Sequence, residues 1–296
     1  MEPLLVTGGA GQLATALAAL GGGAVRRVGR PAFDFDRPET LRATMEAVRP
    51  GLVVNAAAWT AVDAAETDGD GATRANRDGP ATLAALCADA GIPLIHVSTD
   101  YVFDGAKGAP YTEADRTSPT GVYGRTKLEG EQAVLAACPR AIVLRTSWVY
   151  SAAGKNFVRT MLGAAQKAGT LRVVADQRGC PTSARDLAAG ILAIVGVLRG
   201  GWQPAYGGVF HMAGQGDTTW HGLAEAVFAD AARHGRAPPN VQAIRTADWP
   251  TPARRPADSR LDCAKLHDVF GVRLPHWRGA VASVVDELLA VPAAPG

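Results

Sequence analysis

One glycine-rich stretch near the start of the chain decides the fold: Val6-Thr7-Gly8-Gly9-Ala10-Gly11-Gln12-Leu13-Ala14. An apolar run typical of a buried strand precedes it, and residues with the apolar spacing of a helix follow it. Gly8 permits a tight turn, Gly11 lets the backbone approach a pyrophosphate, and Ala14 lets the helix pack closely on the sheet. Free N–H groups at the helix start attract phosphate oxygens. A purely structural turn is the alternative, but the position at the first strand and first helix favours a dinucleotide site with contacts from Gly8, Gly11, Gln12 and Leu13.

Short apolar runs alternate with helix-like stretches through the first half of the chain. The pattern predicts further strands at 24–28, 52–55, 94–98 and 141–145, and helices at 39–48, 72–90 and 120–137. Such alternation is typical of a parallel sheet with helices on both faces, and right-handed crossovers make the sheet doubly wound. We therefore expect an α/β fold with a dinucleotide-binding Rossmann domain over residues 1–150.

The alternation becomes irregular after about residue 150. The pattern predicts helices at 157–167, 184–197 and 219–234, a strand at 207–212, and a Pro-rich loop between 238 and 256. Loops that pack over the carboxyl edge of a sheet often shape a substrate pocket. We predict that residues 151–296 form mainly a smaller substrate-binding lobe, interleaved with segments that return to the Rossmann sheet.

The bulk composition excludes several classes of protein. The chain has 296 residues and a net charge of +2 without long runs of one sign, which argues against a nucleic-acid partner or an anionic membrane surface. There is no basic leader and no run of about 18 apolar residues, so we expect neither a signal peptide nor a membrane span. The four cysteines are far apart and no HxxxH pair occurs, so we expect reduced thiols in a cytoplasmic protein and no zinc site.

Arg30 stands where the second strand should end. An acidic residue there would bind the ribose hydroxyls of NAD, whereas an arginine can pair with the 2′-phosphate of NADP. A solvated surface arginine is the other interpretation, and the sequence does not separate the two. Asp34 and Phe35 follow shortly and are predicted to contact the adenine.

A possible acid-base pair follows the fourth predicted strand. Tyr123 and Lys127 share one face of a predicted helix. An ammonium group beside the phenol would lower its pKa toward neutrality, and such a tyrosine can donate a proton to a carbonyl oxygen whose carbon receives a hydride. Alone, the pair means little, because both residues could equally lie on the protein surface. The position of Ser98 at the end of a buried strand strengthens the catalytic interpretation of the pair. A hydroxyl group next to it at the sheet edge can polarise the same carbonyl.

The glycine turn, the Ser-Thr pair at the strand end and the Tyr123–Lys127 pair together resemble the extended short-chain dehydrogenases. Longer strings make the chain similar to one group in that family, the dTDP-4-dehydrorhamnose reductases, which catalyse the last step to dTDP-L-rhamnose. The resemblance covers almost the whole chain, and its motifs are specific as a set, although each is short. The strings are NAAAWTAVDAAE at 55–66, STDYVF at 98–103, RTSWVY at 145–150, NF at 156–157, DQ at 176–177, PT at 181–182 and RP at 255–256.

This resemblance implies reduction of the C4 ketone of a dTDP-sugar by NADPH or NADH. Tyr123 would be the general acid, Lys127 would tune it and hold the ribose, and Thr99 would polarise the ketone. Asn76 would support the site. The segment after the family's fourth strand would line the cofactor, and residues 151–296 would bind most of the nucleotide sugar. The implied cofactor-lining residues are Ala56, Ala57, Ala58 and Thr60, and the implied substrate residues are Asp100, Tyr101, Trp148, Asn156 and Arg255.

The residue type itself suggests a role for two of these substrate residues. Arg255 is expected to meet the diphosphate, because a forked guanidinium suits phosphate oxygens. Trp148 has a simpler alternative as a core aromatic, since tryptophan is commonly buried.

The chain departs from its relatives at a metal site. Some family members are dimers bridged by Mg²⁺ on glutamates, but this chain has Ala16 and Arg185 at two of those positions and only Glu287 at a third. One carboxylate is a poor site for a hard cation, and Arg185 would repel it. We therefore expect no bound metal and a monomer.

Two rival functions remain open. Relatives of this fold include non-catalytic regulatory subunits, but loss of Tyr123 or Lys127 would favour that reading and both are present. The second rival is an epimerase, or a reductase of another dTDP-deoxysugar. An epimerase keeps its cofactor tightly bound and oxidised, so the absorbance spectrum of the purified protein distinguishes it. The configuration produced at C4 is not encoded in any recognisable motif.

Overall fold

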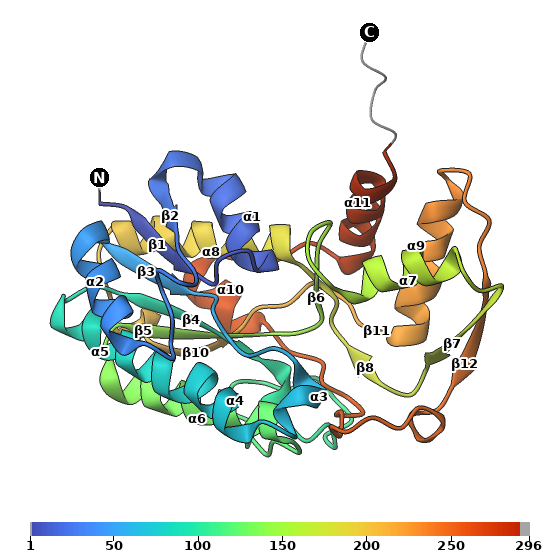
Figure 1. Ribbon diagram of the computed structural model, residues 1–296, viewed down its shortest axis with the longest axis horizontal. Coiled ribbons are helices and arrows are strands. Elements are labelled where there is room, and N and C mark those ends of the chain that lie inside the picture. The colour runs from blue at the N-terminus through green and yellow to red at the C-terminus, as the bar shows by residue number, and fades with distance from the viewer. Residues whose placement is uncertain (1, 291–296) are drawn as a thin grey trace, which may run out of the picture.

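The computed structural model describes residues 2–290, and a six-stranded parallel sheet lies at its centre (Figure 1). The strand order β10-β5-β4-β3-β1-β2 reverses direction between β1 and β3, which confirms the predicted doubly wound α/β fold. The strand at 52–55 is the third along the chain, not the fourth as the resemblance implied. The strands are β1 (Leu4–Thr7), β2 (Val25–Arg27), β3 (Leu52–Asn55), β4 (Leu94–Thr99), β5 (Ala141–Thr146) and β10 (Gly208–His211).

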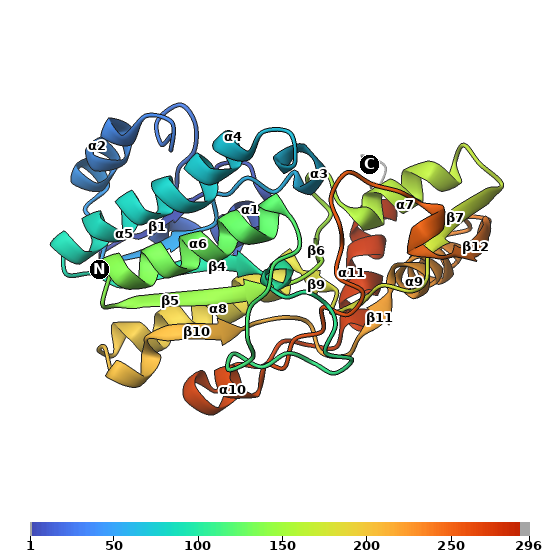
Figure 2. The same ribbon diagram turned by 90° about the horizontal axis from the view of Figure 1, so that it is seen from below.

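Two layers of helices bury the sheet (Figure 2). Alternate strand residues point to opposite faces, so Leu4 and Val6 join one hydrophobic core and Leu5 joins the other. Burial on both faces explains why β1, β3 and β5 are nearly continuous apolar runs, whereas the edge strand β2 exposes Arg26 and Arg27. The first core is covered by α1 (Gln12–Gly21), α8 (Ala184–Arg199) and α10 (Ala264–Phe270), and the second by α2 (Pro38–Val48), α5 (Gly79–Asp89) and α6 (Val122–Ala137).

The long helix predicted over 72–90 is divided. A short helix α4 (Gly69–Thr73) leads into a π-helical turn at Arg74–Asp78, which continues into α5. A π turn inserts an extra residue and is frequent at functional sites. Helix α6 packs closely on this turn at Gly130. A Cβ at that position would overlap the carbonyl oxygen of Asn76, so the contact requires glycine.

The second part of the molecule lies beside the sheet and has its own hydrophobic core (Figure 1). The helices α7 (Phe157–Ala165), α9 (Trp220–Ala232) and α11 (Trp277–Leu289) pack together there. The Pro-rich stretch predicted as loop contains one strand, β12, which pairs with β7. The short strand pairs are β6 (Val149–Tyr150) with β9 (Thr182–Ser183), β7 (Thr170–Val174) with β12 (Asn240–Ile244), and β8 (Arg178–Gly179) with β11 (Thr218–Thr219).

Some segments after residue 150 belong with the sheet rather than with this second part. Strand β10 forms one edge of the six-stranded sheet, and α8 packs against α1. The last six residues of the predicted lobe, 291–296, lie outside the described residues. Within residues 2–290, every helix is too short or too polar to cross a lipid bilayer.

Candidate active site

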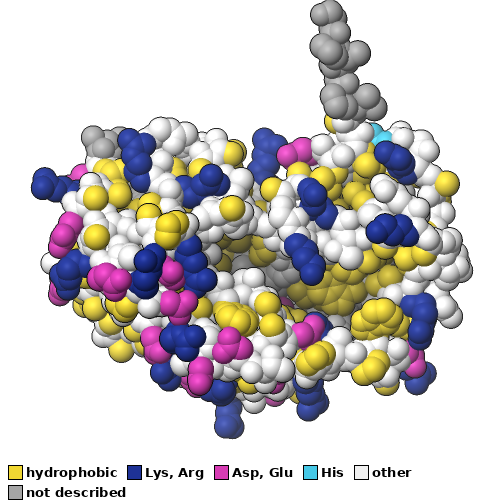
Figure 3. All heavy atoms as spheres, viewed as in Figure 1, with side chains coloured by type: hydrophobic (Ala, Val, Ile, Leu, Met, Phe, Trp, Pro, Cys, Tyr) yellow, Lys and Arg dark blue, Asp and Glu magenta, His cyan; other side chains and the backbone are white. Residues whose placement is uncertain are grey.

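A cavity of about 850 Å³ opens at the carboxyl ends of the parallel strands. Figure 3 shows this face of the molecule hollowed between the part that holds the sheet and the part that holds α7 and α9. Ligands of doubly wound sheets bind at this edge, beside the point where the strand order reverses. Most of the predicted site residues line the wall: Gly8, Gly11, Gln12, Leu13, Arg30, Phe35, Ala56, Ala57, Ala58, Thr60, Thr99, Asp100, Tyr101, Tyr123, Lys127 and Trp148.

The glycine turn lies against the segment that follows β3. Gly8 has φ +105°, and a Cβ there would lie 2.8 Å from the carbonyl oxygen of Ala56. Only glycine avoids both the strain and the overlap. Helix α1 begins with Gly11 as its N-cap, without a side-chain cap and without an acidic residue in its first turn. Its first N–H groups and its positive dipole end are therefore available to an anion, so the turn fits a dinucleotide pyrophosphate.

Asn76 supports the cavity wall from behind. Its Oδ1 accepts a hydrogen bond from the Trp59 N–H at 2.9 Å, and its Nδ2 donates to the Trp59 carbonyl and to Thr126 Oγ1 at 3.2 and 3.1 Å. These bonds fix the loop that carries Ala56–Ala58 and Thr60 into the cavity. Asn76 is fully buried and does not itself line the cavity.

Tyr123 lies in the first turn of α6, and its ring meets that of Tyr101 edge to face with centroids 5.5 Å apart. Burial raises the pKa of Tyr123 to about 12, although the Thr99 hydroxyl acts in the opposite direction. The sequence predicted instead that Lys127 would lower this pKa. A raised pKa keeps the phenol protonated at neutral pH, which is the form that a proton donor requires.

Lys127 is buried one helical turn further along α6. Its Nζ donates to the Val97 carbonyl at 2.7 Å and lies 3.5 Å from His96 Nε2, whose ring is held by Asn55. Burial lowers the pKa of Lys127 to about 8, while Glu131 raises it. The ammonium group is thus directed at the end of β4, on the cavity wall.

A buried ion pair that the sequence did not reveal fixes the end of β4. Arg145 on β5 holds Glu131 on α6 with an Nη2–Oε2 distance of 2.7 Å, and both side chains are almost fully covered. Ser98 Oγ donates to Glu131 Oε1 at 2.5 Å. Because Ser98 precedes Thr99, this network positions the Thr99 hydroxyl at the wall.

Asp100 is a second titratable group of the wall. It is buried, Thr99 Oγ1 donates to its Oδ1 at 3.1 Å, and its Oδ2 lacks a hydrogen-bond partner among the described residues. Burial raises the pKa of Asp100 to about 7, against hydrogen bonds that lower it. The carboxyl group therefore titrates in the neutral range.

This shift makes the stability of the protein depend on pH. The pKa of Asp100 in the folded state is above the usual 3.8, so folding favours the protonated carboxyl group. The contribution of this group to stability is therefore fully present below about pH 4 and is lost as the pH rises through about 7. Replacing Asp100 by asparagine, which stays neutral, should raise the free energy of unfolding by about 2 kcal/mol more at pH 8 than at pH 5. Urea unfolding of both proteins at both pH values measures this. An equal difference at the two pH values would contradict the shift.

Two tryptophans stack in the wall. The rings of Trp148 and Trp220 lie parallel with centroids 3.6 Å apart, and both line the cavity. Trp148 has φ +48°, and Gly179 leaves room for its ring. Trp148 therefore lies at the cavity, not solely in the core. The sequence missed Trp220, because its place at the start of α9 carries no signal of a long-range stack.

Three further predicted residues lie off the wall and bind residues near it. Asp34 Oδ1 accepts from Arg30 Nε at 2.9 Å. Asn156 caps α7 and donates to Gln12 Oε1 at 3.0 Å. Arg255, predicted to meet a diphosphate, here pairs with Asp63 at 2.8 Å and thereby lowers the pKa of Asp63. Wall residues that were not predicted are Gly9, Ala10, Gly29, Phe33, Trp59, Val62, Ala75, Val97, Ser98, Thr146, Ser147, Val149, Lys155, Leu187 and Trp220.

The positions of the metal-binding glutamates of some relatives fall on three helices. Ala16 lies in α1, Arg185 in α8 and Glu287 in α11. Across residues 2–290, no three His, Cys, Asp or Glu side chains are grouped so as to hold an ion.

Comparison with known proteins places the chain among nucleotide-sugar reductases. A family model described as the RmlD substrate binding domain matches residues 1–290. A dTDP-4-dehydrorhamnose reductase of Sinorhizobium fredii is 46% identical over 288 residues, covering 97% of each chain. A Streptomyces antibioticus protein, named as a probable dTDP-4,6-dihydroxy-2-methyloxan-3-one 4-ketoreductase, is 41% identical and covers 97% of this chain and 95% of its own. The solved dTDP-4-dehydrorhamnose reductase of Bacillus anthracis in complex with NADP is similar with a TM-score of 0.89 and 28% identity, covering 97% of this chain and 99% of its own.

Proposed function

The chain belongs to the RmlD substrate binding domain family, and from this premise we propose that it reduces the C4 ketone of dTDP-4-dehydro-L-rhamnose to dTDP-L-rhamnose with NADPH. One observation carries the proposal. A half-buried tyrosine, Tyr123, lines the same cavity as the glycine turn, and Thr99 and Lys127 line that cavity too. A nicotinamide cofactor on that turn and a ketone near that phenol would supply everything the reduction needs.

The cofactor is held by the sheet edge. The start of α1, which has no side-chain cap, would take the pyrophosphate, and Gly8 and Gly11 would let the backbone approach it. Arg30 would bind the 2′-phosphate, Phe35 would pack against the adenine and Lys127 would hold a ribose hydroxyl, since all three residues line the cavity. When bound, NADPH supplies the hydride that the ketone carbon accepts.

The proton comes from the protein. Tyr123 donates its phenolic proton to the ketone oxygen, and the Thr99 hydroxyl donates a hydrogen bond to the same oxygen. One hydride and one proton convert the ketone to a secondary alcohol. The ammonium group of Lys127, one helical turn further along α6, would stabilise the tyrosinate that this transfer leaves, and a proton from solvent then restores the phenol.

The sugar nucleotide lies between the two parts of the molecule. Asp100 and Tyr101 reach the cavity from the sheet side, whereas the stacked Trp148 and Trp220 pack against the core of the second part. We assign residues 1–150 mainly to the cofactor and residues 151–296 mainly to the substrate, in particular the part that holds α7, α9 and α11. The cysteines are free thiols, which supports a reducing cytoplasmic location.

A second candidate is reduction of a different dTDP-deoxysugar. The Streptomyces antibioticus ketoreductase, at 41% identity, favours it. Competition between the two ketones under identical conditions separates the candidates, and a higher kcat/KM for the other sugar would overturn the first. An epimerase is tested by the absorbance of the purified protein, because a reductase should carry no fixed nicotinamide signal.

Arg30 gives a prediction about the cofactor. Replacing Arg30 by alanine should raise the KM for NADPH about tenfold and leave the KM for NADH unchanged, because only NADPH carries the 2′-phosphate that the guanidinium contacts. Steady-state kinetics with each cofactor measures this. Equal effects on both cofactors would contradict the role.

We also propose that the enzyme is a monomer. Ala16 and Arg185 replace two of the glutamates that bridge other members through Mg²⁺. Sedimentation velocity should give the same monomer mass with Mg²⁺ and with EDTA. A dimer that EDTA dissociates would contradict the proposal.

A further inference from the structure

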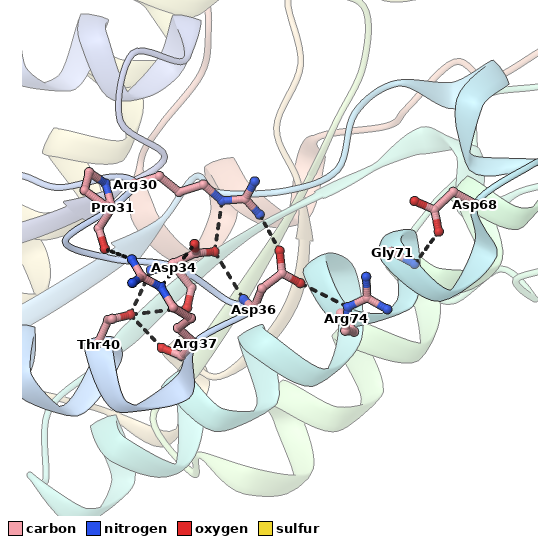
Figure 4. A network of polar contacts seen from close by, with 9 residues as sticks. All are labelled: Arg30, Pro31, Asp34, Asp36, Arg37, Thr40, Asp68, Gly71 and Arg74. Atoms are coloured by element: carbon pink, nitrogen blue, oxygen red, sulfur yellow. Dashed lines mark hydrogen bonds and ion pairs between the residues drawn. The ribbon is translucent and has the colours of Figure 1, made fainter.

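Arg30 belongs to a chain of ion pairs at one end of the cavity (Figure 4). Its Nε lies 2.9 Å from Asp34 Oδ1, and its Nη2 lies 2.9 Å from Asp36 Oδ2. The other oxygen of Asp36 lies 3.0 Å from Arg74 Nε. Each oxygen of the Asp36 carboxylate therefore holds one arginine, and the carboxylate stands between two cations.

The two arginines come from separate segments of the chain. Arg30 follows Gly29 after β2, and Arg74 opens the π turn between α4 and α5. Arg30 lines the cavity, as does Ala75, the neighbour of Arg74. Phe33 and Phe35, which also line it, come from the loop that carries Asp36. The bridge from Arg30 through Asp36 to Arg74 thus spans the place where the proposed function puts the adenosine.

The two aspartates differ in how firmly they are held. Asp34 is mostly covered, with 15% of its side chain exposed, and it also accepts the Asp36 N–H at 3.2 Å and lies near Arg37. Asp36 is 46% exposed and Arg30 is 65% exposed, so water and ligands reach this pair. Asp34 is a fixed part of the loop, whereas the Asp36 carboxylate is free to leave its partners.

A phosphate group has the chemistry to take the place of Asp36. It carries nearly twice the charge of a carboxylate and offers three oxygens to guanidinium groups. Three arginines, Arg30, Arg37 and Arg74, form ion pairs with only two carboxylates, Asp34 and Asp36, although Asp68 and Asp70 also act on Arg74. If the charge of Asp36 were removed, its carboxylate would no longer compete with a phosphate group for Arg30 and Arg74.

We propose that Asp36 determines cofactor specificity: its carboxylate occupies the place between Arg30 and Arg74 that the adenosine 2′-phosphate takes, and so weakens the preference for NADPH. This inference rests on the proposed function. With NADH the bridge stays intact. With NADPH two ion pairs to Asp36 are exchanged for contacts to the phosphate, so the gain from the phosphate is partly offset.

The test replaces Asp36 by asparagine and measures the Kd of 2′-phospho-ADP-ribose and of ADP-ribose by calorimetry at low salt. The variant should bind the phosphorylated ligand about five- to tenfold more tightly and ADP-ribose within twofold of the parent protein. Asp78→Asn is the matched control, because Asp78 is similarly exposed (49%) and paired with an arginine, Arg77, outside the cavity wall. It should change neither Kd.

A second variant tests Arg74 directly. In the Asp36→Asn background, Arg74→Ala should weaken binding of the phosphorylated ligand and spare ADP-ribose. If Asp36→Asn leaves the ratio of the two Kd values within twofold, or if Arg74→Ala weakens both ligands equally, Asp36 is only a structural link. These titrations need no sugar substrate, so a chain that binds both ligands as expected but reduces no ketone would overturn the proposed function alone. A parent protein that binds neither ligand would overturn both.

Discussion

Replacing Tyr123 by phenylalanine is expected to lower kcat at least about a hundredfold, because the change removes the proton donor and keeps the ring. The Kd of the cofactor should stay within about twofold, since the phenylalanine ring still packs against Tyr101. Steady-state turnover together with cofactor titration measures both effects. A loss of affinity without a loss of kcat would point to a binding role instead.

The matched control is Tyr111→Phe. Tyr111 is more buried than Tyr123, its hydroxyl donates to Asp104 at 2.8 Å, and the residue lies off the cavity wall. This change removes the same atom and should leave kcat unchanged. Near-normal turnover of Tyr123→Phe, or an equal loss in Tyr111→Phe, would refute the role of Tyr123.

The largest expected effect on stability comes from Glu131. Replacing it by alanine leaves the Arg145 guanidinium buried without its counter-ion and the Ser98 hydroxyl without its acceptor. Breaking a buried ion pair from one side costs about 3–5 kcal/mol. Urea unfolding should therefore show a loss of this size in the free energy of unfolding.

Two controls separate this effect from a general change in α6. Glu129→Ala removes a more exposed glutamate of the same helix, which pairs with Arg125, and should cost less than about 1 kcal/mol. Adding Arg145→Met to Glu131→Ala removes the unpaired charge as well and should recover much of the loss. A double variant no more stable than Glu131→Ala would show that the unpaired charge is not the cause.

The sequence predicted those parts of the site whose residues lie within a few positions of one another along the chain. The Gly8 turn, the start of α1, and Tyr123 with Lys127 on one helical face each depend on residues a few positions apart. The central strands β1, β3 and β5 were found because burial on both faces leaves a nearly unbroken apolar run. The helix at 72–90 was found too, although its π turn was not.

Contacts between distant segments could not be predicted in this way. The pairs Glu131–Arg145 and Trp148–Trp220 form only when separate elements pack. Arg255 meets Asp63, which is 192 positions away, instead of standing free for a phosphate. The pKa of Tyr123 was mispredicted for the same reason, because a neighbouring lysine can be recognised from its spacing but the extent of burial cannot.

The central claim is a hydride transfer from NADPH to the sugar C4 coupled to a proton from Tyr123. The direct test is turnover of dTDP-4-dehydro-L-rhamnose with NADPH deuterated at the transferred position of the nicotinamide C4, followed by NMR of the product. We expect dTDP-L-rhamnose with one deuterium at C4 and one equivalent of oxidised cofactor. A product without deuterium at C4, or unchanged ketone beside unoxidised NADPH, would contradict it.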